Sequence, residues 1–467
     1  MPHIYAVTNV PPEILAYGMA KYSRSKQPLE KNLRELSNDQ AAKFLQTFYF
    51  DYGHASIADL AHVAVAIEDI SILAAMDIVD EPLWDGQERS TRYQNFDESS
   101  YYRPEEKPLV YDLLTQELFT LYRQIHEQSL DLLIGQYPKP GTMSENSYKR
   151  TMRARAFDIA RYCLPLNTLT SLGQITSARV LEQQIRRLLA SSLPELREIA
   201  HKLKDSIAKD PAVNFSEPGN GQPILPTLVK YTEADSYRLD LRRIFEPLAQ
   251  KLPPLPSLDV ELTIQPPLID SQVAQLLYAY GQVSYRSCLV YAQDLPSAEK
   301  EELISLALAG RSPYDDWPHL MRQAPLQFDM VVDVGAFRDF NRHRRVHKIV
   351  QQLNPELSFS IPEPLIRARS EREFTTGLTN HYDRLSELDA NSPSISYLLP
   401  LAHRRRFLMS MDLPEAAYII ELRSRSQGHF SYRRLANEMY EAIQARYPEF
   451  SRHIRLTPLE DFNPFQR

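Results

Sequence analysis

The feature that most constrains the fold of this 467-residue chain is a pattern that occurs twice along it. Residues 52–82 and 314–344 align without a gap at an offset of 262, and each runs from a Tyr through a helical stretch to an apolar segment with acidic residues. An ordered series of such matches predicts a duplicated domain, with chance similarity between helical patterns as the alternative. The further matches, in the same order, are Leu-Pro-Leu in 160–167 and 396–403, Arg spacing in 185–203 and 422–440, and Pro211 with Pro448.

The proline content indicates where the two copies join. The chain has 34 Pro and only 13 Gly, and residues 216–226 and 252–267 are rich in Pro. Such stretches are typical of loops and linkers. The sequence therefore predicts a first domain over residues 1–225, a linker region over 226–267 and a second domain over 268–467.

Most of the remaining pattern is helical. Apolar residues recur at steps of three and four over residues 29–50, 110–136 and 179–208, which predicts amphipathic helices. Residues 54–80 continue with Ala, Val, Ile and Leu and are interpreted as part of the same helical pattern. The alternation in residues 259–264, DVELTI, predicts one strand.

Charge and composition exclude several classes of protein. The net charge of −7 does not attract nucleic acid, so no polynucleotide partner is expected. Neither G-x-G-x-x-G nor G-x-x-x-x-G-K-[ST] occurs, which disfavours Rossmann and P-loop sites. Cys163 and Cys288 form no C-x-x-C and suggest a reducing compartment. No signal peptide or apolar run of transmembrane length is visible, so we expect a cytoplasmic protein with no membrane partner.

A basic stretch over residues 341–348, NRHRRVHK, is the first candidate site. Arg has a planar fork that suits phosphate, and Arg342 and Arg344 flank His343, which could orient or polarise a ligand. An anion site is one interpretation. A solvated basic helix face is the alternative.

Two further segments carry polar groups that suit a ligand. Glu88, Ser90 and Arg92 lie two residues apart and would share one face of an extended segment, with a capped turn as the alternative. Ser90 has no recognisable general base, which disfavours a nucleophilic serine. In the G-H-A-S segment, Ser56 could cap a helix whose N-terminus favours an anion, and His54 precedes it; a structural His is the alternative. No H-E-x-x-H or cysteine cluster is present, so no metal is expected.

These pieces together resemble the flavin-dependent thymidylate synthase (ThyX) family. Its landmarks are G-H-x-[ST] before a helix, R-H-R, a Ser within E-x-S-x-R-Y, A-R-x-x-L-P and a late helix that carries an Arg. Their order fits residues 45–215 and again 310–450, approximately. The resemblance implies an α+β fold: two copies of a helix-rich domain with a central antiparallel or mixed sheet, forming a pseudo-dimer.

Neither copy keeps the complete set of landmarks. The first copy has G-H-A-S, E-R-S-T-R-Y and A-R-Y-C-L-P, but Asp80 stands where R-H-R would begin. The second copy has R-H-R at residues 342–344, but Gln352 stands where the serine would be. The family builds each site from several subunits, so the resemblance implies one composite site made from both copies and a lost reciprocal site.

The resemblance also assigns roles to individual residues. Ser90, Arg342 and His343 would lie at the catalytic centre. The nucleotide-binding residues would be Glu88, Ser90, Arg92, Arg161, Arg342 and Arg423. The flavin-binding residues would be His54, Ser56, Arg179, Arg342, His343 and Arg344.

Two departures from the family pattern bear on these roles. Asp339 stands where the family has a neutral residue that helps to hold the nucleotide, and an acid there would repel phosphate unless an Arg pairs with it. Arg187, the late-helix Arg of the first copy, needs a one-residue shift to align with the family pattern.

The activity that the resemblance implies is reductive methylation of dUMP to dTMP. FAD would be the cofactor, with methylenetetrahydrofolate and NADPH as co-substrates, and no enzymic nucleophile would be required. The alternatives are a related flavin-dependent enzyme acting on another nucleotide or one-carbon acceptor, and a non-catalytic nucleotide- or flavin-binding paralogue. A duplicated chain can replace a homodimer, so we expect a homodimer that mimics the family's tetramer.

Overall fold

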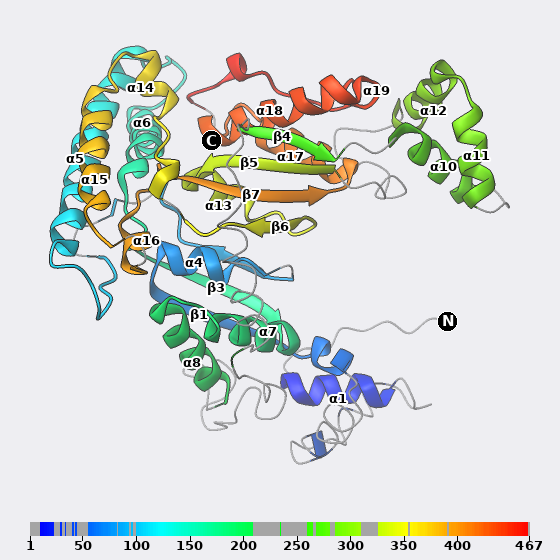
Figure 1. Ribbon diagram of the computed structural model, residues 1–467, viewed down its shortest axis with the longest axis horizontal. Helices are drawn as coiled ribbons and strands as arrows, with labels where there is room; N and C mark the ends of the chain where they lie inside the picture. The colour runs from blue at the N-terminus through cyan, green and yellow to red at the C-terminus, as the bar shows by residue number, and fades with distance from the viewer. Residues whose placement is uncertain are drawn as a thin grey trace. The chain divides into compact units, whose positions relative to one another are not determined.

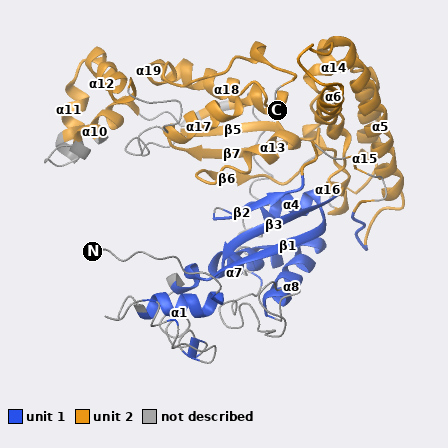
Figure 2. Cartoon of the chain, turned by 180° about the vertical axis from the view of Figure 1, so that it is seen from behind, with its two compact units in different colours: residues 1–89, 102–105, 169–254 blue, residues 90–101, 106–168, 255–467 orange. Residues whose placement is uncertain are grey.

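The computed structural model divides the chain into two compact units (Figure 1, Figure 2). Unit 1 comprises residues 1–89, 102–105 and 169–254, and unit 2 comprises residues 90–101, 106–168 and 255–467. The described residues are 10–22, 55–81, 83–92, 95–96, 100–208, 259–264, 268–280, 285–309, 326–353, 355–389 and 392–465, with a few isolated positions besides.

Unit 1 is built on a three-stranded antiparallel sheet with the order β1-β3-β2. Helices follow β1 and β3 directly, and each begins at a serine cap: the Oγ of Ser71 accepts the N–H of Ala74, and the Oγ of Ser177 accepts that of Val180. The strands are β1 (His62–Ser71), β2 (Asp85–Glu88) and β3 (Leu169–Ser177). The helices are α1 (Pro12–Tyr22), η2 (Ala55–Leu60), α4 (Ile72–Ile78), α7 (Ala178–Leu189) and α8 (Pro194–Ala208).

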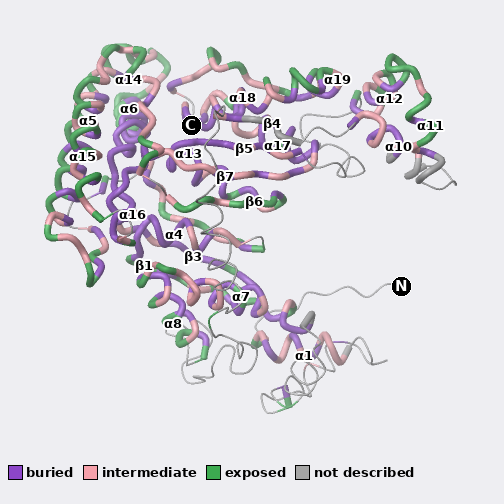
Figure 3. Tube along the Cα trace, viewed as in Figure 1, coloured by how far each residue is buried: buried purple, intermediate pink, exposed green. Residues whose placement is uncertain are grey.

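Unit 2 contains a four-stranded antiparallel sheet with the order β4-β5-β7-β6. Its central strand β5 is largely buried, as Figure 3 shows. Asp333 caps the helix after β5 and Asp412 caps the helix after β7, each accepting a backbone N–H three residues on. The strands are β4 (Val260–Ile264), β5 (Leu326–Asp333), β6 (His347–Val350) and β7 (Arg404–Met411), and the helices packed with them are α13 (Val334–Phe340), α17 (Leu413–Arg423) and α18 (Phe430–Arg446).

A helical arm completes the site-bearing part of unit 2. Its long helix α5 packs against α6, which ends in the short turn η3 that carries Arg161. The arm consists of α5 (Tyr111–Gln136), α6 (Glu145–Ala160), η3 (Arg161–Cys163), α14 (Glu363–Arg367), α15 (Arg372–Ser386) and α16 (Ser394–Leu398). The other elements are α10 (Leu268–Tyr280), α11 (Tyr285–Asp294), α12 (Ser297–Ala309), η5 (Pro355–Leu357), α19 (Pro448–Ser451) and η6 (Leu459–Asp461).

The two sheets repeat one topology. The order β1-β3-β2 corresponds to β5-β7-β6. The cap residues Ser71 and Asp333 are 262 residues apart, and so are β2 and β6. Ser71 donates its hydroxyl to Glu195, whereas Asp333 accepts the hydroxyl of Ser431, so the acid and the hydroxyl have exchanged positions. The sequence repeat therefore corresponds to repeated local structure.

The two Leu-Pro-Leu segments pair with each other inside unit 2. Pro165 and Pro400 form an antiparallel bridge. The N–H of Leu166 donates to the carbonyl of Leu399, and the N–H of Leu401 donates to the carbonyl of Leu164, both at 2.9 Å. Such an exchange of equivalent contacts is what a two-fold relation between equivalent segments produces.

The expected fold class, a helix-rich α+β chain with antiparallel sheets, is confirmed. The helix over residues 110–136 and the strand over 259–264 are found as α5 and β4. The helical interpretation of residues 54–80 is wrong at the centre of this range, because the strand β1 (His62–Ser71) lies there between the helical elements η2 and α4. The helix over 179–208 is two helices, and the helix over 29–50 falls mostly outside the described residues. The domain boundaries stay a prediction.

Candidate functional site

The chain turns sharply between β2 and the helical arm, at Ser90–Arg92. β2 ends at Glu88, so the extended segment expected through Arg92 is instead a turn. The Oγ of Ser90 accepts the backbone N–H of Arg92 at 3.2 Å, which fixes the turn. Thr91, between them, is buried.

Arg92 is held by a bidentate ion pair with Asp158 on α6. Its Nε lies 2.5 Å from Oδ1 and its Nη2 lies 3.0 Å from Oδ2. Burial disfavours the guanidinium charge, but the carboxylate of Asp158 outweighs this and raises the pKa of Arg92. The planar fork is therefore fixed in one orientation with its charge retained.

Arg161 is the most unusual side chain of the site, because it is buried and mostly unsatisfied. It is 3% exposed, and its Nη1 donates to the Oγ1 of Thr91 at a long 3.4 Å. Its Nε and Nη2 have no hydrogen-bond partner among the described residues. Arg338, on α13, donates to the same hydroxyl at 3.4 Å. Because unmade hydrogen bonds of buried charged groups are costly, these groups indicate a place for an anion.

Arg423 ends α17 and is anchored at three points. Its Nη2 donates to the backbone carbonyl of Asp339 at 2.6 Å, its Nη1 lies 3.5 Å from the Asp339 carboxylate, and its Nε donates to Nε2 of His343 at 3.0 Å. Its guanidinium also lies 5.4 Å from the ring centroid of Tyr432.

His343 is a buried neutral base in this arrangement. Burial, followed by the charges of Arg423 and Lys348, lowers its pKa well below the usual value. Its Nε2 accepts from Arg423, so the ring proton belongs on Nδ1, which faces Glu415 at 3.8 Å. In this geometry His343 orients Arg423.

Asp339 shows that four of the arginines lie close together. Burial would raise its pKa, but the charges of Arg423, Arg161, Arg342 and Arg92, in that order, lower it. The acid expected to repel phosphate is thus paired with Arg423. We call the set Arg92, Arg161, Arg338, Arg342 and Arg423 the cation cluster.

The cation cluster unites predicted residues from both halves of the sequence. Arg92 and Arg161 come from the first half and Arg342 and Arg423 from the second, and all belong to unit 2. Arg342 is exposed, and its carbonyl accepts from Arg344 at 2.9 Å. Sequence reasoning missed Arg338, although it precedes Arg342 by four residues, the spacing of one helix face.

The remaining predicted residues belong to unit 1. Glu88 ends β2, and Arg179 pairs with Asp59 at 2.9 Å where both are part-exposed. Ser56 lies in η2, where side chains are not described, and His54 lies outside the described residues. The cation cluster is built without them.

The first half contains an altered counterpart of the Arg423 contacts. Arg187 donates to the backbone carbonyl of Asp77 at 2.7 Å, as Arg423 does to Asp339. In the place of His343 stands Glu81, which pairs with Nε of Arg187 at 2.6 Å. The charge of Arg187 is therefore neutralised by Glu81. Arg187 and Arg423 make the same bond to a backbone carbonyl, although Arg187 aligns with the family pattern only after a one-residue shift.

In the described part of the chain, no group of three or more His, Cys, Asp or Glu side chains is arranged to hold a metal ion. The described helices include none with the length and apolar character needed to cross a bilayer.

Comparison with known proteins identifies the family. The sequence model described as "Thymidylate synthase complementing protein" matches residues 6–210 and 268–449. This match covers most of the chain, so the chain belongs to that family, and the resemblance drawn from the motifs is confirmed.

Relatives are similar over nearly the whole length. A "UPF0159 protein" of Chlamydia muridarum is 26% identical over 97% of this chain and 91% of its own, and one of Thermoplasma acidophilum is 24% identical over 95% of each. Among solved structures, ThyX of Helicobacter pylori complexed with FAD and dUMP is 17% identical, covering 43% of this chain and all of its own at a TM-score of 0.32. A TM-score this low does not itself establish a shared fold.

Proposed function

We propose that this protein is a flavin-dependent enzyme that binds a pyrimidine nucleotide at the cation cluster, most simply dUMP for methylation to dTMP. The observation that carries the proposal is Arg161, a buried guanidinium with Nε and Nη2 unsatisfied among other arginines. A planar fork with two open N–H groups suits a phosphate or a pyrimidine carbonyl.

The charge balance of the cluster supports an anionic ligand. Among the described residues, Asp158 pairs with Arg92 and Asp339 pairs with Arg423, whereas Arg161 forms no ion pair with a carboxylate. The cluster retains positive charge after these pairs are counted. A nucleotide monophosphate would supply the missing negative charge and accept hydrogen bonds.

In this proposal, each half of the sequence contributes different residues to one binding site. The serine block and Arg161 come from the first half, and Arg342 and Arg423 from the second. The pairing of Arg187 with Glu81 supports the loss of the reciprocal site. We infer a tandem duplication, which is supported by the repeated strand order and the offset of 262 residues between the two cap residues. A homodimer with two composite sites would follow.

The residues near the cluster fit an anionic cofactor such as FAD. Arg342 and Arg344 lie two residues apart in the segment between α13 and β6, and Arg342 is exposed. FAD would supply the hydride for the reaction, with NADPH and methylenetetrahydrofolate as co-substrates. Arg342 and Arg344 would hold negative charge, and His343 would keep Arg423 oriented. His54, Ser56 and Arg179 remain proposed flavin contacts. Both cysteines are unpaired, in keeping with a cytoplasmic location.

A second candidate is a related flavin enzyme with another nucleotide or one-carbon acceptor. Asp339 favours it, because a carboxylate accepts hydrogen bonds but donates none and so differs from the neutral residue that the family has at this position. In a non-catalytic paralogue, the third possibility, binding would persist without turnover.

The test begins with the purified protein. We expect flavin absorbance, or uptake of added FAD, and a spectral change on adding dUMP. A protein that takes up no FAD would contradict both enzyme proposals. A flavoprotein whose spectrum does not change on adding dUMP would contradict thymidylate synthesis and leave the second candidate.

A further inference from the structure

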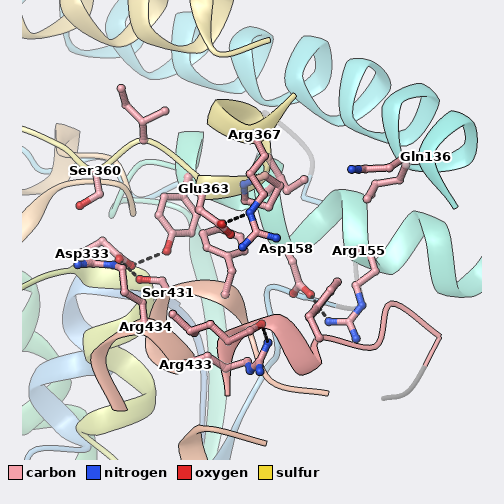
Figure 4. A pocket seen from close by; sticks show the side chains of 18 of the residues that line it. Gln136, Arg155, Asp158, Asp333, Ser360, Glu363, Arg367, Ser431, Arg433 and Arg434 are labelled. Atoms are coloured by element: carbon pink, nitrogen blue, oxygen red, sulfur yellow. Dashed lines mark hydrogen bonds and ion pairs between the residues drawn. The ribbon is translucent and has the colours of Figure 1, made fainter. Parts of the chain in front are cut away.

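Unit 2 contains a cavity that is separate from the cation cluster. Its volume is about 160 Å³, and it lies among α5, α6, α14, α18 and the segment that follows α19 (Figure 4). None of the five arginines of the cation cluster lines it. We propose that this cavity is a second ligand site, which binds a small aromatic carboxylate: one ring with an anionic group.

The size and walls of the cavity suit a single ring. An engineered protein cavity of about 150 Å³ accepts benzene. The apolar walls here include Leu133, Ile159, Ile361, Phe430 and Phe462. The ring of Phe430 lies 5.6 Å from that of Tyr162, centroid to centroid, and extends the aromatic wall.

The acids in the wall already have partners, which disfavours a cationic ligand. Asp333 accepts the hydroxyl of Tyr162 and the N–H of Ala336, both at 2.7 Å, and the hydroxyl of Ser431. Asp158 is occupied by Arg92 and Arg155. Glu363 pairs with Arg367, as the dashed line between them in Figure 4 marks.

One cation in the wall lacks an acidic partner. Arg433 is 2% exposed and donates to three backbone carbonyls, those of Ser424, Pro458 and Leu459. Among the described residues it forms no ion pair with a carboxylate. A guanidinium has five N–H groups, so these three donated bonds leave two N–H groups of Arg433 for a ligand. Burial lowers the pKa of Arg433, although the charges of Asp461 and Glu363 act in the opposite direction.

A carboxylate in the cavity would compensate that charge. The guanidinium of Arg155, which pairs with Asp158 at 3.5 Å, also donates to backbone carbonyls, those of Asn463 and Pro464. Arg367 adds a third, more exposed cation. An apolar ring against Phe430 with its carboxylate toward these arginines satisfies both parts of the wall.

The test uses the full-length protein and calorimetric titration with benzoate. We expect one saturable site per chain. Benzyl alcohol, which keeps the ring, and acetate, which keeps the charge, should each bind at least tenfold more weakly. Absence of saturable benzoate binding, or binding of acetate or benzyl alcohol as tight as that of benzoate, would overturn the proposal.

Matched variants locate the site. Leu133→Phe fills the cavity and should weaken benzoate binding at least tenfold, whereas Leu113→Phe, on an exposed part of the same helix, should leave it unchanged. Arg367→Gln should weaken it several-fold without the risk to folding that Arg433→Gln carries. Excess dUMP should not displace benzoate. Displacement by dUMP, or equal binding by both leucine variants, would place benzoate elsewhere and refute the second site.

Discussion

At the scale of single residues, the partners of each arginine decide what it can bind. Arg423 and Arg187 make the same bond to a backbone carbonyl, but Arg423 meets a neutral His343 where Arg187 meets Glu81. Arg161 is buried, and two of its nitrogens have no hydrogen-bond partner among the described residues. The cation cluster thus keeps positive charge, whereas the charge of Arg187 is neutralised by Glu81.

Substitution in the proposed composite site should differ from substitution at the proposed lost reciprocal site. Ser90→Ala and Arg342→Ala should each weaken dUMP binding by about 1.5–3 kcal/mol, roughly ten- to a hundredfold, because each would remove a contact to a charged group. Substituting Asp80 or Gln352 should be nearly silent. Affinity measured by calorimetry decides this, and equal losses at the two pairs would contradict the composite site.

Asp339→Asn should tighten nucleotide binding. The change removes a negative charge from among Arg92, Arg161, Arg342 and Arg423, while the bond from Arg423 to the backbone carbonyl of Asp339 remains. We expect a gain of several-fold in dUMP affinity, larger at low salt because part of the interaction is screened. Weaker binding would mean that the carboxylate itself contacts the ligand, as the second candidate function requires.

At the scale of secondary-structure elements, capping residues place the arginines. Asp412 begins α17, the helix that ends at Arg423, and accepts the N–H of Glu415 at 2.8 Å. The same arrangement begins α13 at Asp333. Each helix follows its strand without a loop, so the end of the strand fixes where the helix begins.

Removal of this cap should cost stability. Asp412→Ala should lower the free energy of unfolding by about 1 kcal/mol, the usual value of an N-cap. Urea denaturation measures the loss, with Glu387→Ala as a control at an exposed helix end. If Asp412→Ala is no more destabilising than the control, the carboxylate does not stabilise α17.

Sequence patterns predicted α5 and β4, and the offset of 262 found for residues 52–82 also relates β2 to β6, which were not predicted as strands. They failed at β1, because Ala, Val and Ile suit both helix and strand and only the alternation of buried residues distinguishes them. The grouping of Arg92 and Arg161 with the second-half arginines was predicted from the split motifs. Arg338 and the bidentate partner Asp158 were not, because ordinary helical positions give no signal of a partner far away in sequence.

At the scale of the whole molecule, buried histidines make stability depend on pH. Burial lowers the pKa of His381 to about 4 and that of His403 to about 3. The unfolded chain binds protons at these residues below about pH 6.5, whereas the folded chain does not, so stability falls as pH falls.

The free energy of unfolding should therefore decrease between pH 7 and pH 5. Each of these histidines contributes a slope of about 1.4 kcal/mol per pH unit well below pH 6.5. Urea denaturation at several pH values measures it, and His381→Gln should reduce the slope by one proton. Stability that does not change over this range would show that these histidines titrate normally in the folded state.

The proposal that two incomplete halves form one binding site is tested most directly by the affinity for dUMP of two arginine variants. Arg161→Ala removes the unsatisfied guanidinium of the cation cluster, and Arg187→Ala removes the arginine that Glu81 neutralises. With folding of both variants verified by circular dichroism, we predict a loss of ten- to a hundredfold for Arg161→Ala and no more than twofold for Arg187→Ala. Unchanged affinity in Arg161→Ala, or an equal loss in both, would contradict a single composite site.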